Sequence, residues 1–332
     1  MDDKPVVAVI GSGSWATAIT KILHENVGQV HWFIRNEEIR RHLEQHGHNP
    51  TYISSIQFDM SKIRVTGDIN EAVQAAEVVF VVVPSAYLPV WLEDLKPESL
   101  GERFVVTAVK GIVPKLHLTA TEYIHQHFAV PYSKMGVISG PCHAEEVALE
   151  RLSYLTFSCK DMLDASRISA MFRSFYIHTI RSTDIYGTEY SAIIKNIYAV
   201  AAGMAHGLGY GDNFQAVLAC NGQAELMRFL NTTYPAERDP NASAYLGDLL
   251  VTCYSQFSRN RTFGTMIGKG YTVLSAQMEM RMVAEGYYAT EGIHALNANY
   301  GVSMPIAEAM YSVLYNNSRP GVELRNLIEN FV

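Results

Sequence analysis

Two lysines and one aspartate within or beside apolar segments are the residues with the most evident chemical potential. Lys195 lies in an otherwise apolar stretch whose spacing predicts a long helix over 188–206. Lys110 comes directly after the apolar run 104–109, and Asp248 opens the run DLLVTC. Burying an unpaired ammonium group is unfavourable. Lys195 is therefore expected to be paired or used, and Lys110, at the carboxyl end of an expected strand, would face the ligand crevice.

A short polar segment follows Asp248 in the sequence. Ser258, Arg259 and Asn260 form a dense set of hydrogen-bond donors, which suits a phosphate group. Each of these candidates also has a plain alternative. The basic segment could be a solvated loop, Lys195 could reach the surface, and Asp248 could cap a helix.

A glycine-rich turn lies near the start of the chain. Gly11-Ser12-Gly13-Ser14-Trp15-Ala16 follows the apolar run 5–10 and opens the helical segment 15–25. In this pattern the first glycine permits a tight turn, and the second lets a pyrophosphate approach the backbone at a helix N-terminus. The context predicts a dinucleotide site, and the alternative is a merely tight turn between a strand and a helix.

The end of the second expected strand bears on the choice of cofactor. An acid that binds the ribose is expected about 20 residues after the glycines, but the strand 30–34 runs into Arg35. A guanidinium can bind a 2′-phosphate with two hydrogen bonds, which favours NADP(H). Glu37 and Glu38 lie close by and could instead bind a ribose diol, and Arg35 could be solvated.

The elements that must position these residues differ between the two halves of the chain. Apolar runs separated by helical segments predict a parallel sheet covered on both faces. The expected strands are 5–10, 30–34, 62–66, 78–83, 104–109, 135–139, 154–158 and 176–181, with helices at 15–25, 36–46, 69–76 and 161–174. Pro141 is expected to start a further helix.

After about residue 184 the pattern is helical. Helices are expected at 188–206, at 214–230 with Asp212 or Asn213 as its cap, and at 305–315 with Pro305 first. The prediction is an α/β, Rossmann-type doubly wound sheet over 1–184, which binds a dinucleotide. An all-helical domain over 185–332 would bind the substrate and carry the catalytic residues.

Composition excludes several classes of protein. The 332 residues include 26 Lys and Arg against 33 Asp and Glu, a net charge of −7, which argues against a nucleic-acid partner. The four cysteines form no CxxC pair, and His42, His46 and His48 are read as a solvated helix end, so no metal is expected. We find neither an export signal nor an apolar segment long enough for membrane insertion, and we expect a cytoplasmic protein.

At these residues the chain resembles the NAD(P)-dependent glycerol-3-phosphate dehydrogenases of the bacterial type. The resemblance covers nearly the whole chain and keeps the order of its motifs: GSGSWATA, NPTYI, VPS, VKG, SGPCHAEE, KNIYAVAAG, GYGDN, LGDLLVTC, SRNR and VAEG. It implies NADP(H), NAD(H) or both as cofactor, a small phosphate substrate and a homodimer. It also implies that the enzyme supplies glycerol 3-phosphate for phospholipid synthesis.

The resemblance also implies roles for individual residues. It makes Lys195 the proton donor and acceptor, with Lys110 and Asp248 beside it as catalytic residues. The residues implied to contact the substrate are Lys110, Gly140, Cys142, Lys195, Asp248, Ser258, Arg259 and Asn260. Those implied to contact the nucleotide are Gly11, Gly13, Ser14, Trp15, Arg35, Lys110, Ala144, Arg259, Val283 and Glu285.

The chain departs from the family pattern at a few positions. Cys142 stands where Ser or Thr is usual, His143 where Phe is common, and Cys220-Asn221-Gly222 where Thr-Arg-Gly is usual. The first change could alter one hydroxyl contact to the substrate, and the Asn221 change removes a cation. None of these changes alters Lys195.

The implied chemistry is hydride transfer to C2 of dihydroxyacetone phosphate, with Lys195 donating a proton and Lys110 stabilising the oxyanion. Two close ammonium groups lower each other's pKa, whereas Asp248 would raise the pKa of Lys195. The sequence leaves open which effect is larger. Two rival functions are another two-domain dehydrogenase, of the β-hydroxyacid or 6-phosphogluconate type, and a nucleotide-sensing protein without catalysis.

Overall fold

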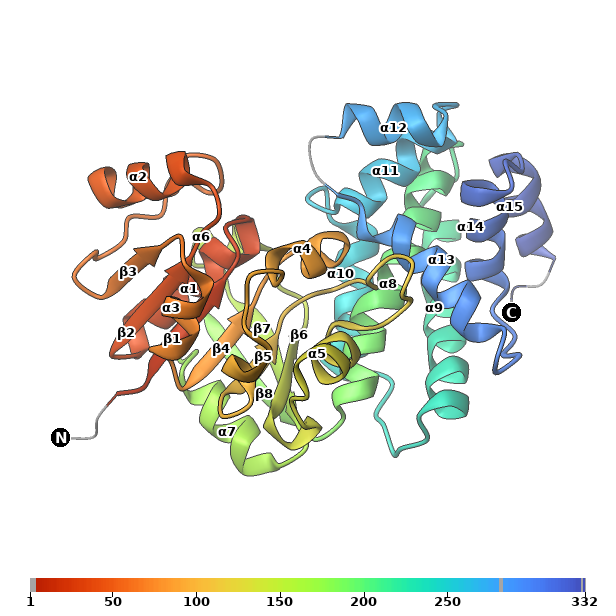
Figure 1. Cartoon of the computed structure of the whole chain (residues 1–332). Helices are drawn as coiled ribbons and strands as arrows, with labels where there is room; N and C mark the ends of the chain where they lie inside the picture. Colours follow the sequence, from red (N-terminus) through yellow and green to blue (C-terminus); the bar gives the residue numbers. More distant parts are fainter. Residues whose placement is uncertain (1–3, 281–282, 330, 332) are drawn as a thin grey trace. The chain divides into compact units, whose positions relative to one another are not determined.

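The computed structural model describes residues 4–280, 283–329 and 331. The chain divides into two compact units (Figure 1): the first comprises residues 1–109 and 120–185, and the second comprises 110–119 and 186–332. The segment 110–119 thus belongs with the C-terminal residues, although it interrupts the first unit in the sequence. The assignment of 1–184 to dinucleotide binding and of 185–332 to substrate binding stays a prediction.

The first unit is built on one eight-stranded sheet, in the order β3-β2-β1-β4-β5-β6-β7-β8 (Figure 1). The chain order of the strands reverses beside β1, as in a doubly wound fold. The predicted strands are all present. They are β1 (Val6–Ile10), β2 (Gln29–Phe33), β3 (Ile63–Thr66), β4 (Val78–Val81), β5 (Phe104–Thr107), β6 (Met135–Ser139), β7 (Ser153–Cys159) and β8 (Ile177–Ser182).

The sheet is parallel except at one place. Strand β7 pairs antiparallel with β6, and β8 then pairs parallel with β7. The connection 140–152 contains only the five-residue helix α6 (Ala144–Ala148). A chain that continues in parallel needs a crossover over one face of the sheet, usually a full helix. Here the chain turns back instead, so the expected all-parallel sheet is wrong at this strand.

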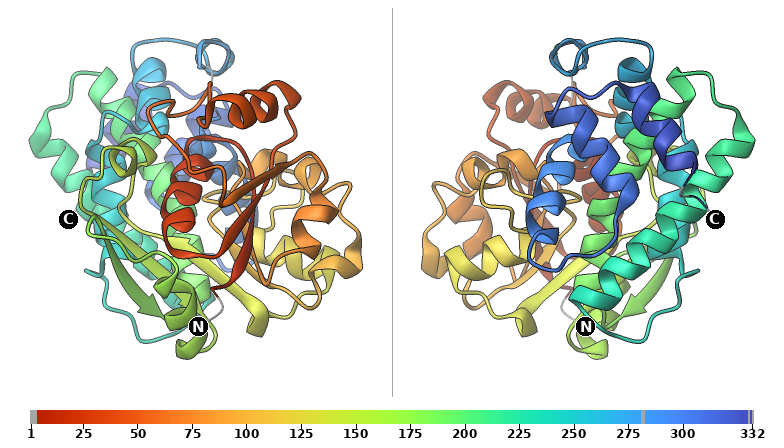
Figure 2. Two further views of the ribbon diagram at one scale, coloured as in Figure 1. Left: turned by 90° about the vertical axis from the view of Figure 1, so that its left-hand side faces the viewer. Right: turned by 90° about the vertical axis from the view of Figure 1, so that its right-hand side faces the viewer.

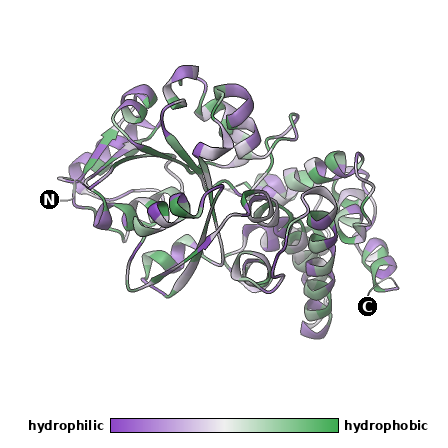
Figure 3. Ribbon diagram, turned by 90° about the horizontal axis from the view of Figure 1, so that it is seen from below, coloured by the Kyte–Doolittle hydropathy of each residue, from purple (hydrophilic) through white to green (hydrophobic). Residues whose placement is uncertain are grey.

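The strands carry mainly hydrophobic colours in Figure 3, whereas the helices also bear hydrophilic residues.

The remaining helices of this unit are α1 (Ser14–Asn26), α2 (Glu37–His46), α3 (Ile69–Gln74), α4 (Leu88–Trp91), α5 (Ala120–Phe128) and α7 (Met162–Ala170), with short 3₁₀ turns at Ser85–Tyr87, Pro97–Leu100 and Tyr132–Lys134. Pro141 does not start a helix, because α6 begins at Ala144 after His143.

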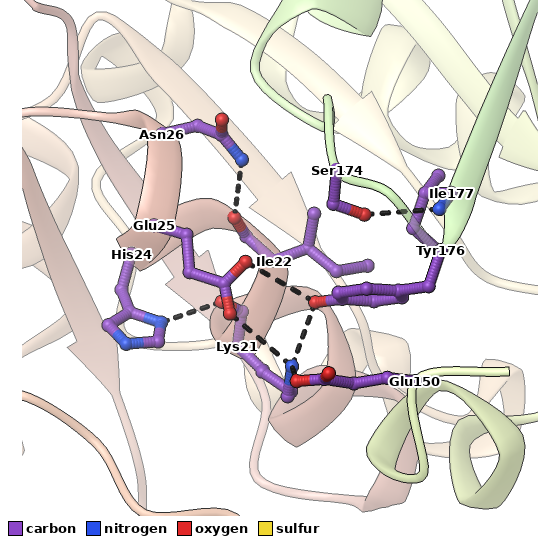
Figure 4. Close-up of polar contacts among 9 residues, drawn as sticks. All are labelled: Lys21, Ile22, His24, Glu25, Asn26, Glu150, Ser174, Tyr176 and Ile177. Carbon is purple, nitrogen blue, oxygen red and sulfur yellow. Dashed lines mark hydrogen bonds and ion pairs between the residues drawn. The ribbon is translucent and has the colours of Figure 1, made fainter.

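A cluster of polar side chains anchors α1 to distant parts of the sheet unit (Figure 4). The Lys21 Nζ donates to Glu150 Oε1 at 2.9 Å and to the Tyr176 hydroxyl at 2.9 Å, and it lies 3.3 Å from Glu25 Oε1. Burial lowers the pKa of Lys21, but the bonds to Tyr176 and Glu150 outweigh burial and raise it above its usual value. The ammonium stays charged, and it holds α1 against the chain after α6 and before β8.

The described residues of the second unit form helices, with a single isolated bridge between Val113 and Leu118. The helices are α8 (Ile185–Gly207), α9 (Asp212–Thr233), η4 (Ser243–Gly247, one π-helical turn), α10 (Asp248–Tyr254), α11 (Arg259–Gly268), α12 (Val273–Glu279), α13 (Glu285–Asn297), α14 (Pro305–Tyr315) and α15 (Pro320–Ile328). Helices α13, α14 and α15 lie side by side (Figure 2). No helix among the described residues could cross a membrane.

The two helix starts predicted here have different outcomes. Helix α14 begins at Pro305, as predicted. The cap predicted for the helix at 214–230 is wrong, because Gly211 precedes the first turn of α9 and Asp212 is already helical. Glycine is acceptable at that position because it leaves the first N–H groups open to water.

Helices α8 and α11 approach until their backbones touch. A Cβ atom added at Gly203 would lie 2.0 Å from the Arg261 carbonyl oxygen, and one added at Gly264 would lie 2.0 Å from that of Val200. Real Cβ atoms do not come so close to a carbonyl oxygen, so both positions require glycine. Gly203 thus allows the close approach of α8 to α11.

We expect Gly264→Ala to destabilise the second unit, because the added methyl group must push α11 away from α8. Overpacking of this kind typically costs about 1–3 kcal/mol. Gly321→Ala in α15 is the matched control, since its Cβ would lie 3.9 Å from the nearest atom, Leu208 Cδ2. That substitution, in the first turn of α15, should change the stability by less than about 0.5 kcal/mol. Urea unfolding of both variants measures the difference, and equal midpoints would contradict the helix contact.

Candidate functional site

The glycine-rich turn has the geometry that a pyrophosphate needs. Gly11 has a φ of +130°, and a Cβ there would lie 2.1 Å from the Val82 carbonyl oxygen. Gly13 precedes the first residue of α1, and nothing lies within 4 Å of the position a Cβ would take. Ser14 and Trp15 form the start of the helix, where N–H groups lack helical partners. The turn therefore has open space beside a row of donors.

A residue that the sequence analysis did not single out holds this turn in place. The buried Asn49 donates through Nδ2 to the Ser12 carbonyl and to Thr17 Oγ1, both at 3.0 Å. Its Oδ1 accepts from the backbone N–H groups of Thr51 and Tyr52, at 3.0 and 3.1 Å. The signal was present in the motif NPTYI, but its partners are remote in the sequence.

Arg35 lies just beyond the end of β2 and reaches the loop after β4. Its Nη1 donates to the Val90 carbonyl at 2.8 Å, and its Nη2 lies 2.8 Å from Glu93 Oε1. The alternative ribose ligand Glu37 is bound to Arg41 at 2.5 Å, within α2. Nothing in the sequence indicates the pairing of Arg35 with Glu93, which lies in a different connection of the sheet.

The segment after β6 contributes three further candidates of the first unit. Gly140 has a φ of +129°, and a Cβ there would lie 2.5 Å from the Tyr154 carbonyl oxygen. Cys142 is buried, and Ala144 begins α6. Tight backbone contact thus fixes the start of this loop at the carboxyl end of β6, the edge at which open α/β sheets bind ligands.

The second unit brings Lys195, Asp248 and Lys110 together. Lys195, on α8, forms a hydrogen-bonded ion pair with Asp248 Oδ1 at the start of α10, and both side chains are buried. The second oxygen, Asp248 Oδ2, lies 3.8 Å from Lys110 Nζ. Asp248 follows the π-helical turn η4, a distortion frequent at functional sites. One carboxylate is thus shared between two ammonium groups.

The surroundings of Lys195 lower its pKa from 10.5 to about 8. Burial is the largest cause, since a desolvated ammonium is unfavourable. Asp248 opposes this effect and raises the pKa, while the charge of Lys110 lowers it further. Of the two effects that the sequence left open, the carboxylate is the larger, and the net lowering of the pKa comes from burial. The side chain can therefore gain and lose a proton near neutral pH.

A chain of asparagine amides connects this cluster to the phosphate-suited segment. Asn196, next to Lys195, donates through Nδ2 to the Lys110 carbonyl at 2.7 Å. Asn260 donates through Nδ2 to Asn196 Oδ1 at 2.8 Å, and its own Oδ1 accepts from the Gly286 N–H at 2.8 Å. These hydrogen-bonded amides fix the backbone at Lys110 relative to α8, α11 and α13.

The remaining candidates of the second unit stand at two helix starts. Ser258 caps α11, and its hydroxyl oxygen accepts from the Arg261 N–H at 3.3 Å, so Arg259 is the first residue of the helix. Glu285 is the first residue of α13, and Val283 lies two residues before it. Gly286 in the same turn binds Asn260, so the two helix starts are held together.

Two residues that depart from the expected family pattern, Cys220 and Asn221, lie on α9. Asn221 donates to the Val217 carbonyl within α9 at 3.0 Å, and Cys220 is exposed.

The rings of His42, His46 and His48 pack on one another, with 3.0 Å between the Nε2 atoms of His42 and His48. Within 4–280, 283–329 and 331, no group of His, Cys, Asp or Glu is arranged to hold a metal.

Comparison with known proteins gives the same family for both parts of the chain. Residues 6–165 match the NAD-dependent glycerol-3-phosphate dehydrogenase N-terminus, and residues 184–324 match the C-terminus of that family. The glycerol-3-phosphate dehydrogenase [NAD(P)+] of an Exiguobacterium species is 36% identical over 97% of this chain and 94% of its own length.

Two further proteins support the assignment. The glycerol-3-phosphate dehydrogenase [NAD(P)+] of Halalkalibacterium halodurans is 36% identical over 95% of this chain and 91% of its own. The crystal structure of glycerol-3-phosphate dehydrogenase from Coxiella burnetii superposes with a TM-score of 0.90 at 26% identity, covering 98% of this chain and 99% of that one. The glycine-rich turn, the shared carboxylate and these matches together show that the chain belongs to the NAD-dependent glycerol-3-phosphate dehydrogenase family.

Proposed function

We propose that this protein interconverts dihydroxyacetone phosphate and sn-glycerol 3-phosphate with NAD(P)H, and that Lys195 is its general acid and base. The observation that carries the proposal is the buried ion pair of Lys195 with Asp248, beside Lys110. A buried lysine with a pKa lowered to about 8 suits proton exchange with a carbonyl or hydroxyl oxygen. The identity of the substrate is inferred from the family to which the chain belongs.

The first unit fits the proposed cofactor. The open space at Gly13 and the start of α1 suit a pyrophosphate, and Ser14 and Trp15 begin that helix. Arg35 stands where the ribose of the adenosine half is expected, and it can bind a 2′-phosphate through two parallel hydrogen bonds. The dinucleotide supplies or removes the hydride at C2 when it is bound. We further assign contacts with the cofactor to Gly11, Lys110, Ala144, Arg259, Val283 and Glu285.

The lysine cluster accounts for the proton and the charge. In the reduction, Lys195 donates its proton to the carbonyl oxygen of the substrate, and Asp248 keeps the ammonium in place. The ammonium of Lys110 stabilises the negative charge that develops on the same oxygen. In the oxidation, neutral Lys195 accepts the proton of the C2 hydroxyl.

The segment Ser258-Arg259-Asn260 provides the phosphate end of the substrate site. The guanidinium of Arg259 supplies charge-assisted donors, and Asn260 has a second N–H besides the one given to Asn196. Because the phosphate does not react, holding it contributes by positioning C2. We assign further substrate contacts to Gly140 and Cys142.

Three further features belong to the same proposal. We infer a cytoplasmic homodimer that supplies glycerol 3-phosphate for phospholipid synthesis, as the resemblance of the chain's motifs to the bacterial-type enzymes implies. Four cysteines without a close pair suit a reducing compartment. Two-subunit assembly is checked by light scattering at several protein concentrations.

Lys195→Met should fold and bind nucleotide but lose turnover by about 10²–10⁴-fold, the usual contribution of general acid catalysis. The assay follows loss of the near-ultraviolet absorbance of NADPH, and of NADH in parallel, with dihydroxyacetone phosphate. A variant that keeps more than about half of the wild-type kcat would remove Lys195 from this role. Wild-type protein that binds nucleotide without any turnover would favour the nucleotide-sensing alternative.

The pH dependence of the reaction should follow the pKa of about 8 at Lys195. Reduction needs the ammonium form, so kcat/KM for dihydroxyacetone phosphate should fall as the pH rises through about 8. Oxidation needs the neutral amine, so its rate should rise over the same range. Lys110→Gln removes a charge that lowers this pKa, so its profile should move to higher pH. An unmoved profile in Lys110→Gln would contradict the coupling.

Arg259→Ala should lower kcat/KM for dihydroxyacetone phosphate by roughly ten- to a hundredfold, the range for loss of a charge-assisted hydrogen bond. Dihydroxyacetone, which lacks the phosphate, serves as the matched substrate. Its own slow reduction should show little additional loss in the variant. Equal losses on both substrates would mean that Arg259 does not hold the phosphate.

A further inference from the structure

The ion pair of Arg35 with Glu93 stands at the edge of the sheet where the proposed cofactor binds. Arg35 follows β2, and Glu93 follows α4 in the connection that leaves β4. The pair is well exposed, with 38% of the Arg35 side chain and 51% of the Glu93 side chain accessible. Nη1 donates to the Val90 carbonyl, so both terminal nitrogens of Arg35 are engaged by the same connection.

A second arginine increases the positive charge at this place. Arg40 Nη1 donates to the carbonyl oxygens of Ile34 and Arg35, at 2.7 and 2.8 Å. A Cβ added at Gly67 would lie 2.7 Å from the Arg40 guanidinium, so the arginine lies against the backbone after β3. Backbone carbonyls hold Arg40, whereas the carboxylate of Glu93 reaches Arg35.

The two forms of the cofactor differ in what they require of this pair. A 2′-phosphate carries nearly two negative charges and binds a guanidinium best through both terminal nitrogens. It must therefore take Arg35 Nη2 from Glu93, or remain close to a like charge. A 2′-hydroxyl needs neither, so NAD(H) leaves the pair intact. Because an exposed ion pair contributes little stability, the phosphate can displace Glu93 at a modest loss of affinity.

We propose that Glu93 sets the preference between NADP(H) and NAD(H), by competing with the 2′-phosphate for the guanidinium of Arg35. Glu93 is thus a specificity-determining residue that weakens NADP(H) binding and leaves NAD(H) binding unchanged. The inference rests on the proposed function, in which Arg35 receives the 2′-phosphate.

The test is equilibrium binding to Glu93→Gln, which removes the charge and keeps an acceptor for Arg35. Calorimetric titration with NADPH and NADH, and with the fragments 2′,5′-ADP and 5′-AMP, needs no turnover. We expect NADPH and 2′,5′-ADP to bind about three- to tenfold more tightly, as for loss of an exposed competing charge. NADH and 5′-AMP should change by less than about twofold. Equal gains for both members of either pair, or no gain for either, would overturn the proposal.

Glu102→Gln is the matched control. Glu102 also forms an exposed ion pair in the first unit, 3.3 Å from Lys134 Nζ, but it precedes β5 and so lies at the opposite end of the strands. The Glu102→Gln substitution removes the same charge from the protein, and we expect no change in the NADPH-to-NADH affinity ratio. A gain in NADPH affinity equal to that of Glu93→Gln would mean that net charge alone is responsible.

The Arg35→Ala background separates this inference from the proposed function. If Arg35 binds the 2′-phosphate, Arg35→Ala should weaken NADPH about tenfold or more and leave NADH nearly unchanged. An unchanged ratio in that variant would refute the role of Arg35 itself. If the ratio falls, adding Glu93→Gln to Arg35→Ala should give no further gain for NADPH. A gain that persists without Arg35 would overturn competition as the mechanism.

Discussion

The buried ion pair between Lys195 and Asp248 is the interaction on which the arrangement of the proposed catalytic groups depends. An ammonium and a carboxylate taken out of water are each unfavourable unless they are paired, so the two side chains must meet as the unit folds. The pair is formed by α8 and α10, and its second oxygen faces Lys110. The folding of this unit must therefore bring three separate parts of the chain together. Residues 110–119, which begin with Lys110, accordingly belong to the helical unit.

Two kinds of contact keep that arrangement rigid. The glycines of α8 and α11 let the two backbones touch, so the distance between the helices is set by the main chain. The amides of Asn196 and Asn260 then fix the register across the same helices. Because these contacts involve backbone atoms or amides hydrogen-bonded at both ends, few rotamer changes are available to loosen them.

The sequence predicted the parts of the molecule whose signals are local. All eight strands were found, because each is a short apolar run ending in a polar loop. The glycine-rich turn was found because its backbone conformation requires particular residue types. The antiparallel β7 was missed, since strand direction depends on how the connection from β6 packs and not on the strand's composition. The helix starts at Pro141 and Asp212 were wrong because several residues there are acceptable caps.

The charged residues of the candidate site could be predicted from the sequence, whereas the asparagines that hold them in place could not. A lysine within an apolar helix is conspicuous, so Lys195 stands out from the sequence alone. Asn49 and Asn196 are not conspicuous, because their partners are backbone carbonyls 37 and 86 residues away. The partner of Arg35 is likewise 58 residues distant, in a different connection of the sheet. Single-sequence patterns do not encode such pairings.

The asparagine chain has a consequence for how the site behaves as protons move. Amide groups neither gain nor lose protons in the physiological range, so the links from Gly286 to the Lys110 carbonyl keep the same donors and acceptors at every step. A histidine or a carboxylate in their place could itself gain or lose a proton and so change from donor to acceptor. The asparagine amides thus keep the same charge and the same hydrogen bonds while Lys195 alternates between charged and neutral. Their geometry is the same for the forward and the reverse reaction.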